Sequence, residues 1–228
     1  MSEFTQIMLS LLRGFGNTCI LFFATLIFAL PLGLIIAFGS MTKFKPVKYL
    51  TKGFVWIIRG TPLMLQILLV SFLPKYVFGS TVKIWAGALN ISVSQMSFVF
   101  VIIAFVVNYS CYFSEIYRSG IEAIPKGQYE AGQVLGMTKS QIFFKVVLFQ
   151  VLKRIIPPMS NETITLVKDT VLAFTLSVVD LLTAAKEAVN IYVTLSPLVY
   201  AGIFFLVFNG LLTLLFGYVE KKMAFYKE

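Results

Sequence analysis

The chain has 228 residues, of which 58% are hydrophobic and 13% are charged, and its mean hydropathy is +0.89. This composition excludes an ordinary soluble globular domain and is typical of an integral membrane protein. The net charge of +9 does not indicate nucleic-acid binding, because Lys and Arg form no single basic stripe with interleaved aromatics. The chain contains no His, so the commonest metal ligand and acid–base group is missing. We expect neither a metal site nor catalytic residues.

Five apolar stretches are long enough to cross a hydrocarbon core of ~30 Å as helices. They lie at about 20–38, 54–73, 96–113, 163–182 and 199–218. The fourth is the least hydrophobic, because it carries Lys168, Asp169 and several hydroxyl groups. Residues 1–17 have apolar positions at helical spacing and are predicted to be an amphipathic segment at the membrane surface. The sequence therefore predicts an all-α membrane protein with one transmembrane domain over residues 1–228.

Positive charges are distributed unevenly between the two sides of these spans. If the loop after the first span is cytoplasmic, 14 of the 19 Lys and Arg residues lie on that side, four lie opposite and Lys168 lies within a span. The positive-inside rule favours this orientation. It places the N-terminus outside, the C-terminus in the cytoplasm, and the long segment of about 114–158 in the cytoplasm.

This cytoplasmic segment contains several helix boundary signals. Pro125 suits the first turn of a helix, and Gly136 suits a left-handed cap at its end. Thr138 and Gln141 have the spacing of a capping box, which predicts a second helix. The prolines at 157–158 are expected to break or kink the chain before it re-enters the membrane. The segment is thus predicted to form a helix, a glycine turn and a second helix.

Residues 124–137 of this segment resemble the EAA loop of ABC importer permeases. The family pattern is Glu-Ala-Ala, three residues, Gly, nine residues, Ile, one residue and Leu-Pro. The positions that match it are Glu130, Ala131, Gly136 and Leu148, and the positions that depart from it are Gly132, Val146 and Phe149. The departure at 149 removes the proline of the pattern, so the pair at 157–158 is expected to supply the bend.

The resemblance implies that the segment is a coupling element for a separate ATPase. The residues that it assigns to this role are Gln128, Gly127, Glu130, Ala131, Gly132 and Gly136. Small side chains at Ala131 and Gly132 would let the helix press into a groove of the partner, and Glu130 could pair with a partner cation. The alternative is an ordinary helical hairpin that caps the bundle.

Further short matches occur in the same order as in permeases of the polar amino-acid type, which includes histidine, glutamine and arginine importers. They are Arg59-Gly60-Thr61-Pro62-Leu63 with Gln66, Glu115 with Arg118 and Gly120, Asn161-Glu162, and Lys168-Asp169-Thr170. This resemblance implies a type I ABC importer permease with five transmembrane helices and cytoplasmic coupling helices. Its implied partners are an ABC ATPase dimer, a second permease subunit, an extracellular or periplasmic amino-acid-binding protein and the lipid of a bacterial plasma membrane.

The chain contains no G-x-x-x-x-G-K-[ST] motif with which to bind nucleotide phosphates. We therefore expect no cofactor in this chain, with ATP and Mg²⁺ bound by the partner ATPase. The stretch 74–95, which includes Trp85, is expected to carry extracellular structure that contacts the binding protein.

Polar side chains within the predicted spans are candidates for the substrate path, because charges in a bilayer must face water or a bundle interior. On a helix at 100° per residue, a stripe on one face of the fourth span would hold Glu162, Thr165, Asp169, Ser177 and Asp180. The candidate path residues are Asp169, Thr170, Glu115, Gln66, Glu162 and Thr165. The alternatives are that these groups join helices to one another, and that Glu115 is an ion-pair partner of Arg118 or Arg59.

Two other functions would fit a polar membrane bundle. A secondary transporter driven by an ion gradient would show inverted repeats and discontinuous helices, and no repeat is found across the two halves of the chain. A membrane scaffold without a transport role would leave the polar stripe without a purpose. The sequence leaves open which amino acid moves, whether the two permease subunits are identical, and whether the binding protein is free, tethered or absent.

Overall fold

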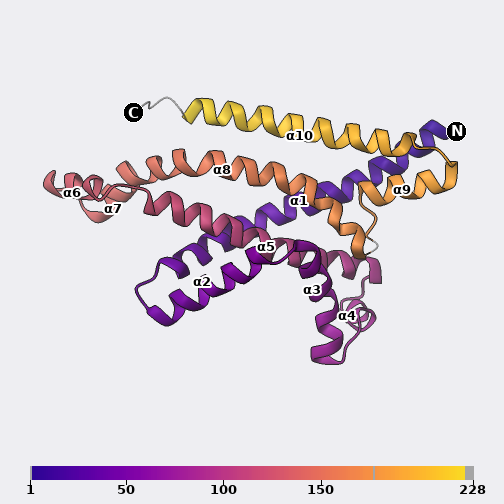
Figure 1. The fold of residues 1–228 in the computed structure, drawn as a ribbon, viewed down its shortest axis with the longest axis horizontal. Coiled ribbons are helices and arrows are strands. Elements are labelled where there is room, and N and C mark those ends of the chain that lie inside the picture. The colour runs from indigo at the N-terminus through magenta and orange to yellow at the C-terminus, as the bar shows by residue number, and fades with distance from the viewer. Residues whose placement is uncertain (1, 177, 224–228) are drawn as a thin grey trace.

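The computed structural model describes residues 2–176 and 178–223, which form helices and no strand. Four long helices run along the long axis of the molecule (Figure 1). They are α1 (Glu3–Met41), α5 (Val93–Glu122), α8 (Leu148–Asp169) and α10 (Ser196–Met223). The other elements are α2 (Lys45–Gly60), α3 (Leu63–Phe78), α4 (Val82–Ala88), α6 (Lys126–Val134), α7 (Lys139–Ile142), the π-helix η1 (Phe143–Val147), the 3-10 helix η2 (Thr170–Leu176) and α9 (Leu181–Tyr192).

Helix α5 lies at the centre and packs against α1, α2, α3, α4 and α8. Its contact with α1 is close because Gly33 has no side chain. A Cβ at this position would lie 2.9 Å from the Ser110 carbonyl oxygen and 3.0 Å from the Phe113 Cβ. Small residues permit such close approach between membrane helices, where packing replaces the hydrophobic effect as the main attraction.

The N-terminal segment, predicted to be an amphipathic surface segment over residues 1–17, is the first part of a longer helix. Helix α1 is continuous from Glu3 to Met41, and Ile7 and Leu11 are buried in a cluster with alanines of α9 and α10. At Gly14 a Cβ would lie 2.7 Å from the Asp180 carbonyl oxygen. Protein therefore covers part of the apolar face, at Ile7 and Leu11, whereas Phe4 and Leu12 are 56% and 49% exposed. A location of this exposed part at the membrane surface stays a prediction.

The second predicted span, 54–73, is not one straight helix. Helices α2 and α3 meet at an angle of 110°, and the bend falls at Thr61 and Pro62, which lie between them. Thr61 is extended (φ −115°, ψ 144°), the conformation that a following proline favours. Pro62 also has no N–H with which to continue the hydrogen-bond ladder of α2.

The fourth predicted span, 163–182, is also placed differently. Helix α8 begins at Leu148 and runs through the prolines at 157–158, so a break there is wrong, and the alternative of a kink at this pair stays a prediction. Proline has a φ near −65°, which is itself helical, so the pair removes ladder hydrogen bonds without ending the helix. After α8 the chain passes through η2, and Asp180 is the N-cap of α9. Asp180 therefore leaves the predicted stripe, and Ser177 lies outside the described residues.

The apolar character of the helices agrees with a membrane protein. Among the described residues, α1, α5 and α10 are each long and apolar enough to cross a membrane, and the bent pair α2–α3 would add a fourth span. Helix α8 does not meet this criterion but packs against both α5 and α10. The C-terminal part of α8 belongs to the fourth predicted span, 163–182, which is the least hydrophobic of the five.

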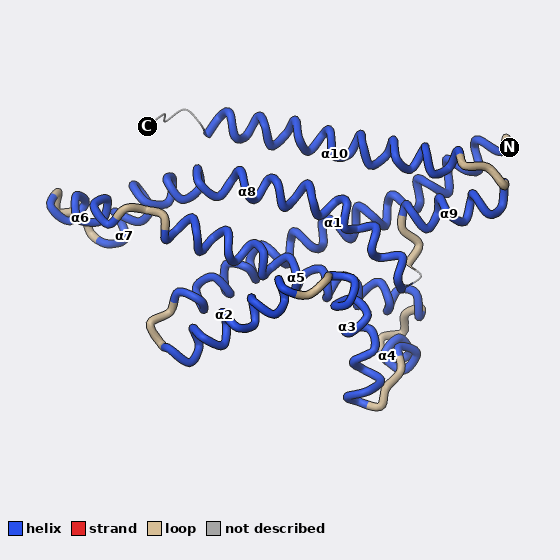
Figure 2. The backbone as a smooth tube through the Cα atoms, viewed as in Figure 1, coloured by secondary structure: helices blue, strands red, loops and turns tan. Residues whose placement is uncertain are grey.

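The two ends of the molecule differ in the segments that they carry. The helices α6 and α7, the turn into α2 and the C-terminal end of α10 lie at one end, whereas the N-terminus and α9 lie at the other (Figures 1 and 2). The three segments in which the sequence concentrates its cations therefore gather at the same end of the bundle.

Candidate functional site

A cavity of about 540 Å³ opens where the bend between α2 and α3 faces α5 and α8. Its volume lies within the range of about 300–1,000 Å³ that is usual for small-molecule sites. The polar side chains that line it are Arg59, Thr61, Asn108, Tyr109, Tyr112, Glu162, Thr165 and Asp169. The described part of the chain thus places both acidic and basic groups around one hollow at a helix break.

Helix α8 supplies the acidic wall of this cavity. Glu162, Thr165 and Asp169 follow one another at spacings of three and four residues, so they share one face of the helix. The structure brings these three candidate path residues together. Thr170 is not among the lining residues, because it is fully buried and its hydroxyl donates to the Val167 carbonyl oxygen at 2.6 Å.

The carboxylate of Asp169 is held by a tyrosine of the central helix. The hydroxyl of Tyr109 donates to Asp169 Oδ2 at 2.7 Å, and the Tyr109 side chain is only 2% exposed within the main core cluster. A buried aromatic ring has little freedom, so the hydrogen bond fixes the direction of the carboxylate. Among the described residues, no side chain binds the carboxylate of Glu162, which leaves it open to the cavity.

Gln66 stabilises the bend rather than lining the cavity. Its Nε2 lies 2.7 Å from the Ile58 carbonyl oxygen and 2.8 Å from Thr61 Oγ1, and its Oε1 accepts from Asn108 Nδ2 at 3.0 Å. The side chain is 6% exposed. It therefore satisfies the groups that the helix break leaves unpaired and joins the corner to α5.

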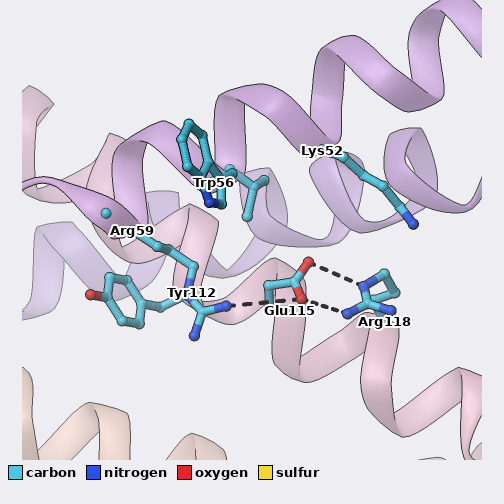
Figure 3. A pocket seen from close by; sticks show the side chains of 8 residues that line it. Lys52, Trp56, Arg59, Tyr112, Glu115 and Arg118 are labelled. Atoms are coloured by element: carbon cyan, nitrogen blue, oxygen red, sulfur yellow. Dashed lines mark hydrogen bonds and ion pairs between the residues drawn. The ribbon is translucent and has the colours of Figure 1, made fainter.

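Glu115 lines a neighbouring cavity of about 420 Å³ (Figure 3), and it lies in the C-terminal part of α5. Its two carboxylate oxygens accept from Arg118 Nε at 3.1 Å and Nη2 at 2.6 Å. Arg59 approaches the same carboxylate at 3.9 Å, and Arg118 also donates to Glu122 at 2.6 Å. Glu115 is therefore an ion-pair partner of both arginines and does not line the larger cavity.

Three polar residues that line the cavity were not among the predicted path residues, namely Asn108, Tyr109 and Tyr112. A signal for them was present, because residues 108, 109, 112 and 115 follow helical spacing and form a polar face on an otherwise apolar span. Arg59 was considered as part of a short motif and as an ion-pair partner of Glu115, but not as a path residue, although it lines both cavities.

The cytoplasmic segment forms the predicted hairpin of two short helices. Gly136 follows α6 with a φ of +72°, as expected of a left-handed cap. Thr138 and Gln141 form both hydrogen bonds of a capping box at the start of α7. These local signals are confirmed, and the docking role of the hairpin stays a prediction.

The candidate docking residues do not share one environment. Glu130 and Ala131 are exposed, and a Cβ added at Gly127 would meet open space. Gly132 is buried, and a Cβ there would lie 2.6 Å from Ile142 Cγ1. The glycine is thus required to close the hairpin on itself, not to approach a partner. Gln128 also acts internally, since its Oε1 accepts from Gln150 Nε2 at 3.1 Å.

Comparison with known proteins identifies the class to which this fold and hairpin belong. Residues 29–225 match the family model for the binding-protein-dependent transport system inner membrane component. An L-cystine transport system permease protein of Bacillus subtilis (strain 168) is 34% identical over 93% of this chain and 86% of its own. An arginine transport system permease protein of the same organism is 31% identical over 93% of this chain and 92% of its own.

Solved structures agree with these relatives. An amino acid ABC transporter crystallised with histidines has a TM-score of 0.82 and 27% identity, with 96% of each chain covered. A methionine ABC transporter in an inward-facing conformation has a TM-score of 0.70 at 17% identity, which shows the same fold. The chain belongs to the family of binding-protein-dependent inner membrane transport components and has the fold of a type I ABC importer permease.

Membership of this family decides against the alternative of a secondary transporter driven by an ion gradient. The broken pair α2–α3 is one of the features expected of that rival. The family match covers this break, so a discontinuous helix here is compatible with a permease subunit of a binding-protein-dependent system. The chain is a transport subunit rather than an enzyme.

Proposed function

We propose that this chain is the permease subunit of an importer for polar amino acids and that the larger cavity is its substrate site. The observation that carries the proposal is the pair of carboxylates, Glu162 and Asp169, that face one cavity at a helix break. Every amino acid carries an α-ammonium group, for which such a wall is complementary. The relatives named for L-cystine and arginine, and the solved amino acid transporter, support the same substrate class.

The hydrogen bond from Tyr109 gives Asp169 the leading role in this recognition. A carboxylate whose direction is fixed loses little freedom when a ligand binds, and preorganisation of this kind raises affinity. Thr165 and Glu162 lie about one and two turns away from Asp169 on the same wall and supply further acceptors. The size of the cavity and the mixed lining favour a substrate with several polar groups.

Energy for transport comes from a separate ATPase dimer that binds ATP and Mg²⁺ and docks on the α6–α7 hairpin. Glu130 and Ala131 are exposed on this hairpin, as are Val134 and Leu135, whose side chains are 88% and 78% exposed. An exposed apolar tip beside one carboxylate suits a groove with an apolar floor and a cationic rim. The hairpin then faces the cytoplasm, the C-terminal end of α10 lies on the same side, and the N-terminus lies outside.

The complete importer contains a second permease subunit, which closes the path opposite the cavity, and an external amino-acid-binding protein. Helix α4 and the C-terminal part of α3 project from the bundle (Figure 1). Their exposed aromatic side chains include Tyr76 and Phe78, and this region is the contact that we assign to the binding protein.

The test is uptake by the reconstituted complex with Asp169→Asn, using L-cystine, L-arginine and L-glutamine as probes. Loss of one charged hydrogen-bond partner costs about 2 kcal/mol, so the apparent KM should rise about 30-fold with assembly intact. Glu187→Gln is the matched control, because Glu187 is exposed on α9 and lies outside both cavities. Uptake by Asp169→Asn at the level of this control would overturn the assignment.

A further inference from the structure

Arg59, Gly60 and Tyr112 line both cavities, and Arg59 is the charged residue among these three. Figure 3 shows its side chain in the smaller cavity. Arg59 stands in the last turn of α2, immediately before the bend that opens the larger cavity. On one side it faces Glu115, and on the other it borders the hollow that contains Glu162 and Asp169. A long side chain at such a boundary can reach a partner in either cavity.

The contacts that hold Arg59 in the smaller cavity are loose. Its Nη1 lies 3.9 Å from Glu115 Oε2, which is about 1 Å longer than a charge-assisted hydrogen bond. Arg118 already occupies both oxygens of that carboxylate at 3.1 and 2.6 Å. The guanidinium also lies 4.9 Å from the centre of the Tyr112 ring, yet 43% of the side chain remains exposed. Arg59 thus interacts more weakly with Glu115 than Arg118 does.

Among the described residues that line the larger cavity, Arg59 is also the only one with a basic side chain. The other charged groups there are the carboxylates of Glu162 and Asp169 on α8. Beside Arg59, Leu63 is the first residue of α3, and the N-cap, Pro62, makes no side-chain capping hydrogen bond. The N-terminus of a helix carries a partial positive charge. One end of the cavity therefore favours an anion, and the α8 wall favours a cation.

We propose that Arg59 binds the α-carboxylate of the substrate and that it leaves Glu115 to do so. This inference rests on the proposed function, since it assumes that an amino acid occupies the larger cavity. The substrate would then be held at both ends, with its ammonium at Asp169 and its carboxylate at Arg59. Arginine is suited to this role because its planar guanidinium can donate two parallel hydrogen bonds to a carboxylate.

The change of partner connects the site to the docking hairpin. Glu115, Arg118 and Glu122 form a continuous chain of ion pairs along the last turns of α5. Helix α6 begins at Lys126, four residues after α5 ends at Glu122. Substrate binding would remove Arg59 from this chain of ion pairs and break one of the contacts that join the end of α2 to α5. Arg59 would thus have two discrete positions whose balance the substrate changes, as physical coupling requires.

The first experiment measures discrimination between amino acids and their carboxamides. The complex of permease and ATPase is reconstituted, and stimulation of ATP hydrolysis is measured with L-cystine, L-arginine and L-glutamine and with the α-carboxamide of each. The wild-type complex should prefer the amino acid about 30-fold. Arg59→Ala should reduce this preference to about threefold or less. Lys52→Ala removes a cation from the same helix, beside the smaller cavity only, and should keep the preference.

The outcomes separate this inference from the proposed function. Full preference for the amino acid in Arg59→Ala would overturn the role of Arg59 while leaving the importer assignment in place. A wild-type complex that responds to none of the three amino acids would overturn both. Arg59→Lys keeps the positive charge but not the planar guanidinium, so it should recover part of the preference for the amino acid. If Arg59→Ala had lost this preference only through damage to folding, this partial recovery would not be explained.

A second measurement addresses the two positions of Arg59. Glu115→Gln removes the competing charge and should lower the apparent Kd for the transported amino acid about threefold. In an Arg59→Ala background the same change should have no effect on that Kd, because the competition no longer exists. An equal effect of Glu115→Gln in both backgrounds would show that Glu115 does not compete for Arg59.

Discussion

The α6–α7 hairpin and the cavity at the bend between α2 and α3 are built in different ways. The hairpin is defined by signals within a short stretch, namely the glycine cap at Gly136, the capping box at Thr138 and the contact of Gly132 with Ile142. The cavity depends on pairs far apart in sequence, such as Tyr109 with Asp169 and Gln66 with Asn108, which are 60 and 42 residues apart.

This difference predicts how the two regions respond to change. A hairpin held by local contacts can keep its shape while the bundle changes conformation, which suits an element that transmits force. A cavity assembled from α2, α3, α5 and α8 changes whenever these helices move, which suits a site that must bind and release. Damage to the hairpin should therefore affect coupling, and damage to the cavity should affect substrate recognition.

The largest effect should come from Glu130→Arg. Reversal of a charge at a docked interface costs about 2–5 kcal/mol, so uptake should fall at least about 30-fold. Binding of the amino acid to the permease should remain within about twofold of wild type. The measurements are co-purification of the ATPase, uptake and ligand binding. Glu187→Arg, which makes the same reversal at an exposed position of α9, is the control, and an equal loss in both variants would refute a specific docking role.

A smaller effect is expected from Gln66→Leu, which removes the hydrogen bonds of Gln66 to the Ile58 carbonyl, to Thr61 and to Asn108 at the bend. An unsatisfied buried polar group costs about 1–3 kcal/mol. Affinity for the transported amino acid should fall about tenfold, with ATPase docking unchanged. Thermal unfolding measures the loss of stability, and ligand binding measures the loss of affinity.

Gln133→Leu is the matched control for this substitution, because Gln133 is exposed on α6. It should leave substrate affinity unchanged. If Gln66→Leu weakened ATPase docking more than substrate affinity, the separation between cavity and hairpin would be wrong.

The smallest effect should come from Gly136→Ala. A φ of +72° is unfavourable for any residue with a Cβ, at a cost of about 1 kcal/mol. ATPase affinity should therefore fall about fivefold, measured by titration of the ATPase onto the permease in detergent. Gly53→Ala is the control: Gly53 lies within α2 with open space around its Cβ position, and alanine there should be neutral or stabilising. Equal docking by both variants would show that the hairpin tolerates a distorted turn.

Local sequence predicted some features of this protein correctly. The hairpin boundaries followed from capping residues whose hydrogen bonds lie within three or four positions of one another. The acidic face of α8 at Glu162, Thr165 and Asp169 followed from helical spacing, because α8 continues unbroken to Asp169. Where that helix ends, the same spacing failed, and Asp180 became the N-cap of α9 instead.

Tertiary packing decided the rest. Hydrophobic spacing showed that residues at the start of α1 share an apolar face, but only the close approach at Gly14 shows that α9 covers part of it. The sequence predicted one helical span over 54–73, whereas the structure has a bend of 110° within it, which the hydrogen bond between Gln66 and Asn108 joins to α5. The composition, the spans and the local caps are properties of neighbouring residues, so the sequence alone determined them. The cavity and the place of Arg59 between two carboxylate clusters depend on side chains brought together from α2, α5 and α8, which only the packed bundle could decide.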